Sequence, residues 1–304
     1  MSADAEGDDM MMCCAACSTA GVDGIKLKKC NACYLVRYCG VKCQKEHRPQ
    51  HKRECKKRVA ELRDEILFKQ PDSTHLGDCP ICFLPLPIDE NKSTMMVCCS
   101  KFICNGCDYA NQVREREGKR QHKCAFCRHP APKSKEESVR NLMKRVEAND
   151  PAAMCHVGSL CFHDGDYSGA FEYWIRAAGL GDVGAHFELS CLYRDGKGVE
   201  KDRKKEVYHL EEAAICGHPN ARNNLACREL EENGRNDKAA KHWIIAANLG
   251  HEGSLETLKD AFGKGYFSKE DFAAALRGHQ AAVDATKSPQ RDEAEAFIAL
   301  QKYR

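Results

Sequence analysis

Apolar residues recur at helical spacing through the second half of the chain. Leu142 and Val146 lie on one face of a helix predicted within 134–150, behind a capping box formed by Ser134 and Glu137. The first half has fewer such stretches. A helix in 56–68 is predicted from spaced apolar residues, and the run 108–121 predicts a second, exposed helix.

The helical pattern repeats itself beyond residue 150. Segments 174–182, 210–218 and 243–251 align directly and follow one another at a nearly constant interval. Each carries an alanine pair followed by a glycine. The small alanines let two helices approach closely, and the glycine ends the second helix in a left-handed cap. Repetition at an interval of this length predicts an α-solenoid of helix pairs. A degenerate fourth unit at 252–285 and a polar helix at 287–304 would complete the array, because its last apolar face must be covered.

Cysteine dominates the chemistry of the segment 1–130. Of the 21 cysteines, 16 precede residue 128. A C-x2-C pair forms a tight turn that aims two thiolates at one ion, whereas C-x3-C or H-x3-C places its side chains one helical turn apart. The first eight such ligands follow one another closely and are enough for two tetrahedral zinc sites. They are Cys14, Cys17, Cys30, Cys33, Cys39, Cys43, His51 and Cys55.

Two alternatives stay open for this first group. Cys13 could replace Cys14, although only Cys14 gives the x2 spacing to Cys17. Disulfides or buried free thiols could also account for the cysteines. The acidic N-terminus does not have the pattern of a signal peptide, so we expect a reducing compartment, cytoplasmic or nuclear, where paired cysteines favour zinc.

A second group of eight cysteines follows a turn-rich linker at 70–77. Its members are Cys79, Cys82, Cys98, Cys99, Cys104, Cys107, Cys124 and Cys127. Adjacent cysteines point in different directions in an extended chain, so the pair at 98 and 99 needs a bent backbone. We expect Cys98 to be the fourth ligand of the second site here, with His122 and His129 as alternatives.

The first group, which ends in CQKEHRPQHKREC, resembles the MYND zinc finger. The resemblance implies two cross-braced zinc sites and a surface that grips a short, proline-containing peptide. The implied sets are Cys14, Cys17, Cys39 and Cys43 for one ion, and Cys30, Cys33, His51 and Cys55 for the other. His47 stands where the family usually has an aromatic residue, which we expect to weaken the surface groove but not the metal sites.

The second group resembles a RING finger, which also cross-braces two zinc ions. One implied set is Cys79, Cys82, Cys104 and Cys107, and Cys99, Cys124 and Cys127 supply three ligands of the other. Lys101 stands at the family's histidine position, and a protonated ammonium cannot bind zinc. In RING-type ubiquitin ligases, an apolar residue of the first knuckle and an arginine after the last cysteine contact the ubiquitin-conjugating enzyme. Ile81 and Arg128 occupy these positions.

The repeated segments resemble the Sel-one-like repeat, a relative of the tetratricopeptide repeat, most clearly in AHFELSCLYRDGKGV of the second unit. The expected fold is therefore a set of small zinc-stabilised modules followed by an all-α solenoid. The expected parts are 1–12 (acidic disordered tail), 13–69 (MYND-type finger with a C-terminal helix), 70–77 (linker), 78–130 (RING-like finger), 131–150 (spacer helix), 151–286 (Sel-one-like repeats) and 287–304 (capping helix).

Charge and hydropathy narrow the classes of partner. The net charge of +2 argues against a chain that binds polyanions over its whole length. Residues 26–69 carry fourteen Lys/Arg against five Asp/Glu, but no helix places base-reading side chains between the ligands, so we expect a solvated basic face and no nucleic-acid partner. No apolar run is long enough to span a bilayer, so we expect no membrane partner.

These patterns predict a zinc-binding adaptor for protein–protein interaction, with about four Zn²⁺ ions, two per finger. Its partners would be proteins or short peptides. The alternative is a RING-type ubiquitin ligase with the repeats as substrate receptor, in which the finger would hold the charged conjugating enzyme in a reactive pose. No HExxH, P-loop, GxGxxG or GxSxG motif occurs, so no catalytic residue is assigned.

Overall fold

The structure is a computed structural model that describes residues 13–21, 26–265 and 268–301. It divides into two compact units, residues 1–69 and 70–304, which are described separately. The acidic tail predicted at 1–12 lies outside the described residues.

The first unit is a strand pair followed by one long helix. Strands β1 (Lys28–Lys29) and β2 (Arg37–Tyr38) pair antiparallel, and α1 (Val41–Leu67) follows at once. The helical pair of ligands predicted at 51 and 55 and the helix predicted in 56–68 are therefore parts of a single helix. Only His51 and Leu67 of α1 are buried, so the apolar core of this unit is small.

The second unit opens with the other cysteine-rich module. The short turn η1 (Glu90–Lys92) leads into the hairpin of β3 (Ser93–Met96) and β4 (Lys101–Cys104), and α2 (Asn105–Glu117) follows directly. Leu86 and Ile103 form its buried centre together with the cysteines.

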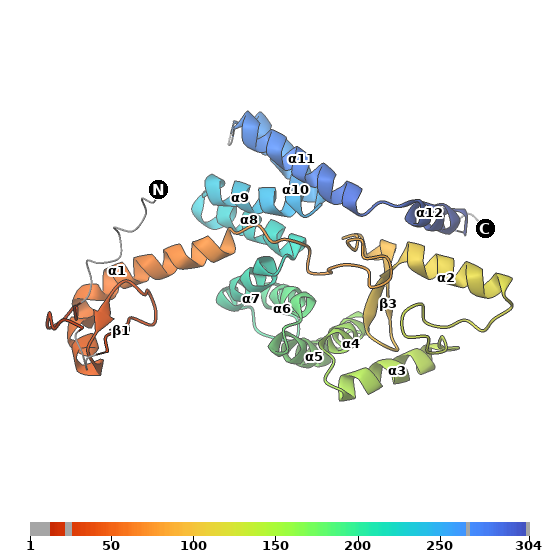
Figure 1. Cartoon of the computed structure of the whole chain (residues 1–304), viewed down its shortest axis with the longest axis horizontal. Helices are drawn as coiled ribbons and strands as arrows, with labels where there is room; N and C mark the ends of the chain where they lie inside the picture. Colours follow the sequence, from red (N-terminus) through yellow and green to blue (C-terminus); the bar gives the residue numbers. More distant parts are fainter. Residues whose placement is uncertain (1–12, 22–25, 266–267, 302–304) are drawn as a thin grey trace, which may run out of the picture. The chain divides into compact units, whose positions relative to one another are not determined.

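Helices make up the rest of the second unit. Ser134 caps α3 (Lys135–Glu147) by accepting a hydrogen bond from the backbone N–H of Glu137 at 3.2 Å. The helices that follow are α4 (Pro151–His163), α5 (Tyr167–Gly179), α6 (Val183–Asp195), α7 (Arg203–Ile215), α8 (Pro219–Asn233), α9 (Asn236–Asn248), α10 (Glu252–Gly263), α11 (Lys269–Ala285) and α12 (Pro289–Gln301). The helices from α4 to α11 pack as consecutive pairs, as Figure 1 shows.

Corresponding residues of the repeats form the core between these helices. Trp174, Leu210 and Trp243 occupy equivalent positions and are all buried, and the alanine pairs that follow them are buried as well. Gly158 leaves room for the ring of Trp174, whose indole N–H donates to the carbonyl of Cys155 at 3.0 Å. Small residues on one helix therefore accept large ones from the next, as the sequence pattern predicts.

Two segments outside the repeats are anchored within the second unit. In the linker, the N–H of His75 donates to the carbonyl of Gly217 at 3.1 Å, and its ring stacks on that of His218. The helix predicted as the end cap of the solenoid forms as α12, and it packs against α2 of the cysteine-rich module. Its role as a cap stays a prediction. No helix of the described residues is both long and apolar enough to cross a membrane.

Candidate metal centres and binding surfaces

Each C-x2-C pair outside α2 folds as a knuckle with the same backbone. In the pairs beginning at 14, 30, 79 and 124, the N–H four residues after the first cysteine donates to the carbonyl of that cysteine at 2.8–3.1 Å. The residue after the second cysteine has a left-handed φ between +57° and +63°, as at Phe83 and Arg128. This turn directs both thiols to one side, as the spacing predicts.

The first unit holds two groups of four ligands. Cys14 and Cys17 lie with Cys39 and Cys43, and Cys30 and Cys33 lie with His51 and Cys55; within each group all donor atoms are within 4.8 Å of one another. The chain enters the groups alternately, so the grouping is the cross-brace that the family resemblance implied. Cys13 is exposed and lies in neither group.

His47 occupies the position where the motif usually has an aromatic residue, and it contacts the metal ligand His51. Its ring stacks on that of His51, with centroids 5.8 Å apart, and its Nδ1 lies 3.1 Å from the hydroxyl of Tyr38. The Nε2 of His51 lies 3.1 Å from the sulfur of Cys33 and is therefore the donor that faces the cluster. Although His47 differs from the family's usual residue, its ring still makes an aromatic contact with a ligand of the metal site.

The second unit holds two further groups. Cys79 and Cys82 lie with Cys104, the N-cap of α2, and Cys107, in the first turn of that helix. The other group is Cys98, Cys99, Cys124 and Cys127. Cys98 and Cys99 reach one site because the chain turns sharply there, with the N–H of Ser100 donating to the carbonyl of Met96 at 2.7 Å.

The two histidines considered as alternatives lie outside the described clusters. His122 directs Nδ1 to the carboxylate of Glu115 at 2.9 Å. The carbonyl of His129 accepts a hydrogen bond from the N–H of Cys124 at 2.7 Å, which is a knuckle contact of the backbone.

The donor sets and their spacing fit zinc. A tetrahedral site with Zn–S bonds of about 2.3 Å has sulfur atoms about 3.8 Å apart. The sulfur–sulfur distances are 3.6 Å for Cys17–Cys39, 3.8 Å for Cys82–Cys104 and 3.9 Å for Cys99–Cys124. Three all-thiolate groups and one Cys3His group accommodate about four zinc ions, two in each module.

The electrostatics of the thiols also call for a cation. The hydrogen bond between Cys79 and Cys104 lowers the pKa of Cys79 to about 4 and raises the pKa of Cys104. In the first unit, the hydrogen bonds that Cys43 shares with Cys39 and Cys17 raise its pKa to about 12, whereas, against the opposing effect of burial, backbone hydrogen bonds lower the pKa of Cys14 to about 6. In each of these two clusters one thiol ionises easily, and another is opposed by the charge already present. A divalent cation removes that conflict.

Residues 14–55 match the family model described as MYND finger. This segment is a MYND finger. Residues 151–182, 183–218 and 219–251 each match the Sel1 repeat model, so the helix pairs α4–α5, α6–α7 and α8–α9 are Sel1 repeats.

The curated relatives match the chain over short segments. The chain is similar to "SET domain and MYND-type zinc finger protein 6" of Schizosaccharomyces pombe, with 41% identity over 51 residues, 17% of this chain and 11% of that protein. It is 55% identical over 31 residues to "Histone-lysine N-methyltransferase SMYD3" of Homo sapiens, 10% of this chain and 7% of that protein. The chain thus spans about a tenth of the length of these relatives.

Two solved structures similar to the chain are Sel1-type proteins. The crystal structure of a Sel1 repeat protein from Oxalobacter formigenes is 29% identical, covering 50% of this chain and 66% of that one at a TM-score of 0.44. The structure of c5321, a protective antigen of uropathogenic Escherichia coli strains with an SLR fold, is 19% identical, covering 66% of this chain and 40% of that one at a TM-score of 0.37.

A groove runs beside the MYND cluster that contains Cys30, His51 and Cys55. We call it the α1 groove; its volume is about 620 Å³, and Tyr38, Val41 and Val59 supply apolar surface. Exposed cationic side chains from one face of α1 also line it. These are Lys45, Arg48, Lys52 and Lys56. The groove therefore combines an apolar contact surface with positive charge.

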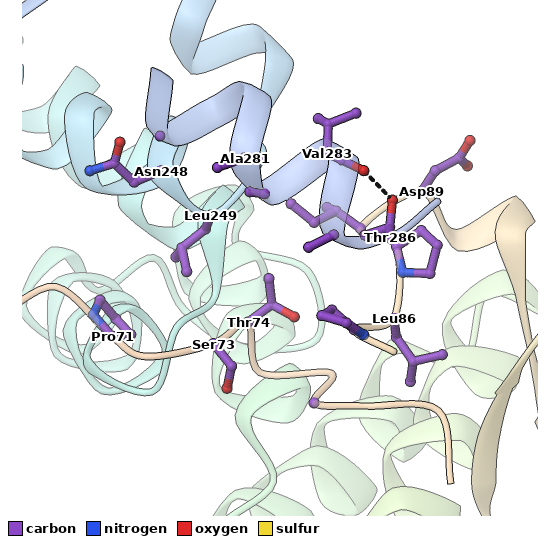
Figure 2. Close-up of a pocket in the computed structure, with 18 of the residues that line it drawn as sticks. Pro71, Ser73, Thr74, Leu86, Asp89, Asn248, Leu249, Ala281, Val283 and Thr286 are labelled. Atoms are coloured by element: carbon purple, nitrogen blue, oxygen red, sulfur yellow. Dashed lines mark hydrogen bonds between the residues drawn. The ribbon is translucent and has the colours of Figure 1, made fainter. Parts of the chain in front are cut away.

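A second cavity lies in the other unit, between the linker, the loop at 85–92, the end of α9 and helix α11. Its volume is about 730 Å³. Figure 2 shows the extended chain with Pro71 and Thr74 on one side and Ala281 of α11 on the other, with Leu249 between them. Sequence reasoning missed this cavity, because its walls come from segments that lie far apart in the chain.

The two residues proposed to contact a conjugating enzyme differ in their surroundings. Ile81 is 37% exposed. The guanidinium of Arg128 donates to Glu115 at 2.8 Å and to the side-chain oxygen of Asn111 at 2.7 Å. Burial alone would raise the pKa of Glu115, but the N–H of Lys123 and the partners His122 and Arg128 lower it. Arg128 is thus held against α2 of its own module.

Proposed function

We propose that this chain is a zinc-binding adaptor of the cytoplasm or nucleus, in which the MYND finger binds a short proline-containing peptide and the Sel1 repeats hold a second partner. The α1 groove is the observation that carries the proposal. Its apolar surface at Val41 and Val59 suits the rings of prolines, which lose little conformational entropy on binding. Its lysines and arginine favour a peptide with acidic residues beside the prolines.

The matched relatives do not extend the proposal to methyl transfer. Their similarity lies in a segment of 51 residues or fewer, and residues 151–251 of this chain are repeats. Zinc in the MYND finger would be held by the eight ligands described and would fix the groove, without a chemical step.

A peptide-display selection against the full zinc-loaded chain tests the groove. We expect enriched peptides to contain proline and acidic residues. Binding should fall at least tenfold in Val41→Asp and Val59→Asp, because a carboxylate in the groove disfavours both kinds of residue. Ile66→Asp is the matched control, since Ile66 is an exposed apolar residue of the same helix outside the groove. If the enriched peptides bind both groove variants as tightly as the unchanged chain, the α1 groove is not their binding site.

A RING-type ubiquitin ligase is the second candidate. It is supported by the exposed apolar residues of two knuckles, Ile81 and Phe83 in the first and Phe126 in the last. Such a finger would position a charged conjugating enzyme and would supply no nucleophile. The hydrogen bonds that hold Arg128 to Glu115 and Asn111 must be exchanged before Arg128 can contact a partner.

An autoubiquitination assay of the full chain with a panel of conjugating enzymes decides between the two candidates. Ligase function predicts activity that falls in Ile81→Ala and in Arg128→Ala while zinc content stays unchanged. If both variants keep full activity, Ile81 and Arg128 do not contact the conjugating enzyme. If no conjugating enzyme gives activity, the adaptor is the function that stands.

A further inference from the structure

The helix α12 lies along α2 of the second cysteine-rich module (Figure 1). The rings of Phe297 and Tyr109 are 4.7 Å apart between centroids, and the guanidinium of Arg116 lies over the Phe297 ring at 5.6 Å. Lys92, which precedes the hairpin, forms an ion pair with Glu295 at 2.8 Å. A helix near the end of the chain therefore covers the central helix of the finger.

Arg291 carries this contact into the metal site itself. Arg291 is 6% exposed, and its guanidinium donates to the carbonyls of Pro85 at 2.8 Å and Leu84 at 3.2 Å, in the loop after the first knuckle. Its Nη2 also lies 3.5 Å from the sulfur of Cys82. One guanidinium thus binds a zinc ligand and the loop that positions that ligand.

The backbone of α12 approaches as closely as the side chain does. A Cβ added at Gly106, between Cys104 and Cys107, would lie 2.9 Å from Cγ of Arg291 and 3.0 Å from its Cα. Gly106 is within α2 and needs no left-handed conformation. The glycine is required by the approach of α12 and not by its own helix.

Charge explains why an arginine is buried here. Burial of a guanidinium is strongly unfavourable unless an opposite charge lies nearby. Among the ion pairs of the described residues, none joins Arg291 to a carboxylate. Four thiolates around one Zn²⁺ carry a net charge of −2, so the cluster of Cys79, Cys82, Cys104 and Cys107 would supply the countercharge.

We propose that Arg291 is an outer-shell positioning residue of this zinc site, and that it couples zinc binding to docking of the C-terminal helix on α2. The charge of the loaded cluster stabilises the docked Arg291, and docking in turn fixes the Cys82 knuckle. Because linkage is reciprocal, loss of either one weakens the other. The cluster of Cys98, Cys99, Cys124 and Cys127 has no contact with Arg291 among the described hydrogen bonds and lies outside this coupling.

Site-resolved thiol alkylation of the full chain in chelator tests the first half of the proposal. In Arg291→Met, the four cysteines of the coupled cluster should be alkylated about 10- to 100-fold faster than in the unchanged chain. The eleven cysteines of the other three clusters should keep their rates. Arg291→Lys should restore part of the protection, because it keeps the positive charge. Arg277→Met is the matched control, since Arg277 is exposed on α11.

Gly106→Ala supplies a variant that leaves Arg291 intact. It should undock α12 by steric conflict and accelerate alkylation of the same four cysteines. This variant keeps the test decisive if Arg291→Met fails to fold, which circular dichroism would show. Rates in Gly106→Ala equal to those of the unchanged chain, with α12 undocked, would overturn the coupling.

Hydrogen exchange tests the reciprocal half. Removal of zinc from the full chain should increase exchange in residues 289–301, and return of zinc should restore their protection. In Arg291→Met the protection of these residues should be low with or without zinc. If zinc leaves the exchange of α12 unchanged in the native chain, the helix is docked by packing alone and the proposal fails.

Discussion

The two zinc modules use the same ligand geometry but differ in what surrounds it. Apart from cysteines, Val36 and Tyr38 are the buried apolar residues in the core of the MYND finger. The second module buries Leu86 and Ile103, receives α12 on its central helix, and packs Met95 against the core of the repeats. Zinc must therefore supply nearly all of the stability of the first module, whereas packing supplies part of it in the second.

Removal of zinc should have the largest effect and should separate the modules. A structural zinc contributes roughly 10 kcal/mol or more, far beyond what the few buried residues of the MYND finger can replace. In chelator, hydrogen exchange should show complete loss of protection in β1 and β2. Protection in β3 and β4 should fall only in part, because the repeats still hold Met95. Equal loss in both hairpins would contradict the comparison.

Truncation of one core residue in each module sharpens the same difference. Ile103→Ala should destabilise the second module by about 2–5 kcal/mol, because it leaves a cavity in a packed core. Val36→Ala removes fewer atoms from a site that is already at the edge of its core, so a cost of about 1 kcal/mol is expected. Local free energies from hydrogen exchange at saturating zinc measure both. The reverse order of the two costs would count against a packed second module.

A pair of glycines measures how firmly the linker attaches the second module to the repeats. Gly217 and Gly250 have φ of +82° and +93°, so alanine costs about 1–2 kcal/mol at either position. Only at Gly217 would the added Cβ collide with the carbonyl of Ser73 in the linker. Gly217→Ala should therefore lower the thermal midpoint more than Gly250→Ala does. Equal midpoints would mean that the linker contact contributes nothing.

Acid should weaken the second unit through its buried histidines. Burial lowers the pKa of His75 to about 4 and that of His218 well below its usual value. His218 also caps α8 by accepting from the N–H of Ala221 at 3.3 Å, which only its neutral form can do. Because the unfolded histidines take up protons first, this stability is complete above about pH 6.5 and is lost as the pH falls toward 4.

The expected loss is at most about 2 kcal/mol per histidine between pH 6.5 and 5. Thermal unfolding followed by the fluorescence of Trp174 and Trp243 measures it, since both tryptophans of the chain lie in the repeats. In His75→Gln the midpoint should change less between pH 7 and pH 5 than in the unchanged chain. An identical pH dependence in the two proteins would exclude His75 as the cause.

Local spacing was enough to predict the repeats and the metal-binding modules. The family models match a MYND finger and Sel1 repeats, and the structure groups the cysteines in the sets that the cross-brace implied. The repeats and the ligand pairs depend on residues a few positions apart, where a turn or a helix fixes the side-chain direction, whereas the grouping of the pairs was implied by the family resemblance and not by local spacing. The contact roles of Ile81 and Arg128 stay predictions.

Contacts between distant segments could not be predicted in the same way. The run around Tyr109 has the polar composition of an exposed helix, yet Phe297 covers it. The linker has the composition of a turn, yet His75 is held by Gly217 and His218. Arg291 is one charged residue on a polar helix, and its role depends on a partner in a different part of the fold. No periodic pattern carries that information.

The contact between Arg291 and Cys82 joins positions 209 residues apart, which has a consequence for synthesis on the ribosome. All eight ligands of the MYND finger have been made by residue 55, so this finger can take up its metal while most of the chain is still to be translated. The second module has all its cysteines by residue 127, but Arg291 is translated only after the whole repeat array. In a nascent chain, the two zinc sites of the MYND finger would therefore be complete early. The site of Cys79, Cys82, Cys104 and Cys107 would lack its outer-shell arginine until α12 has been translated.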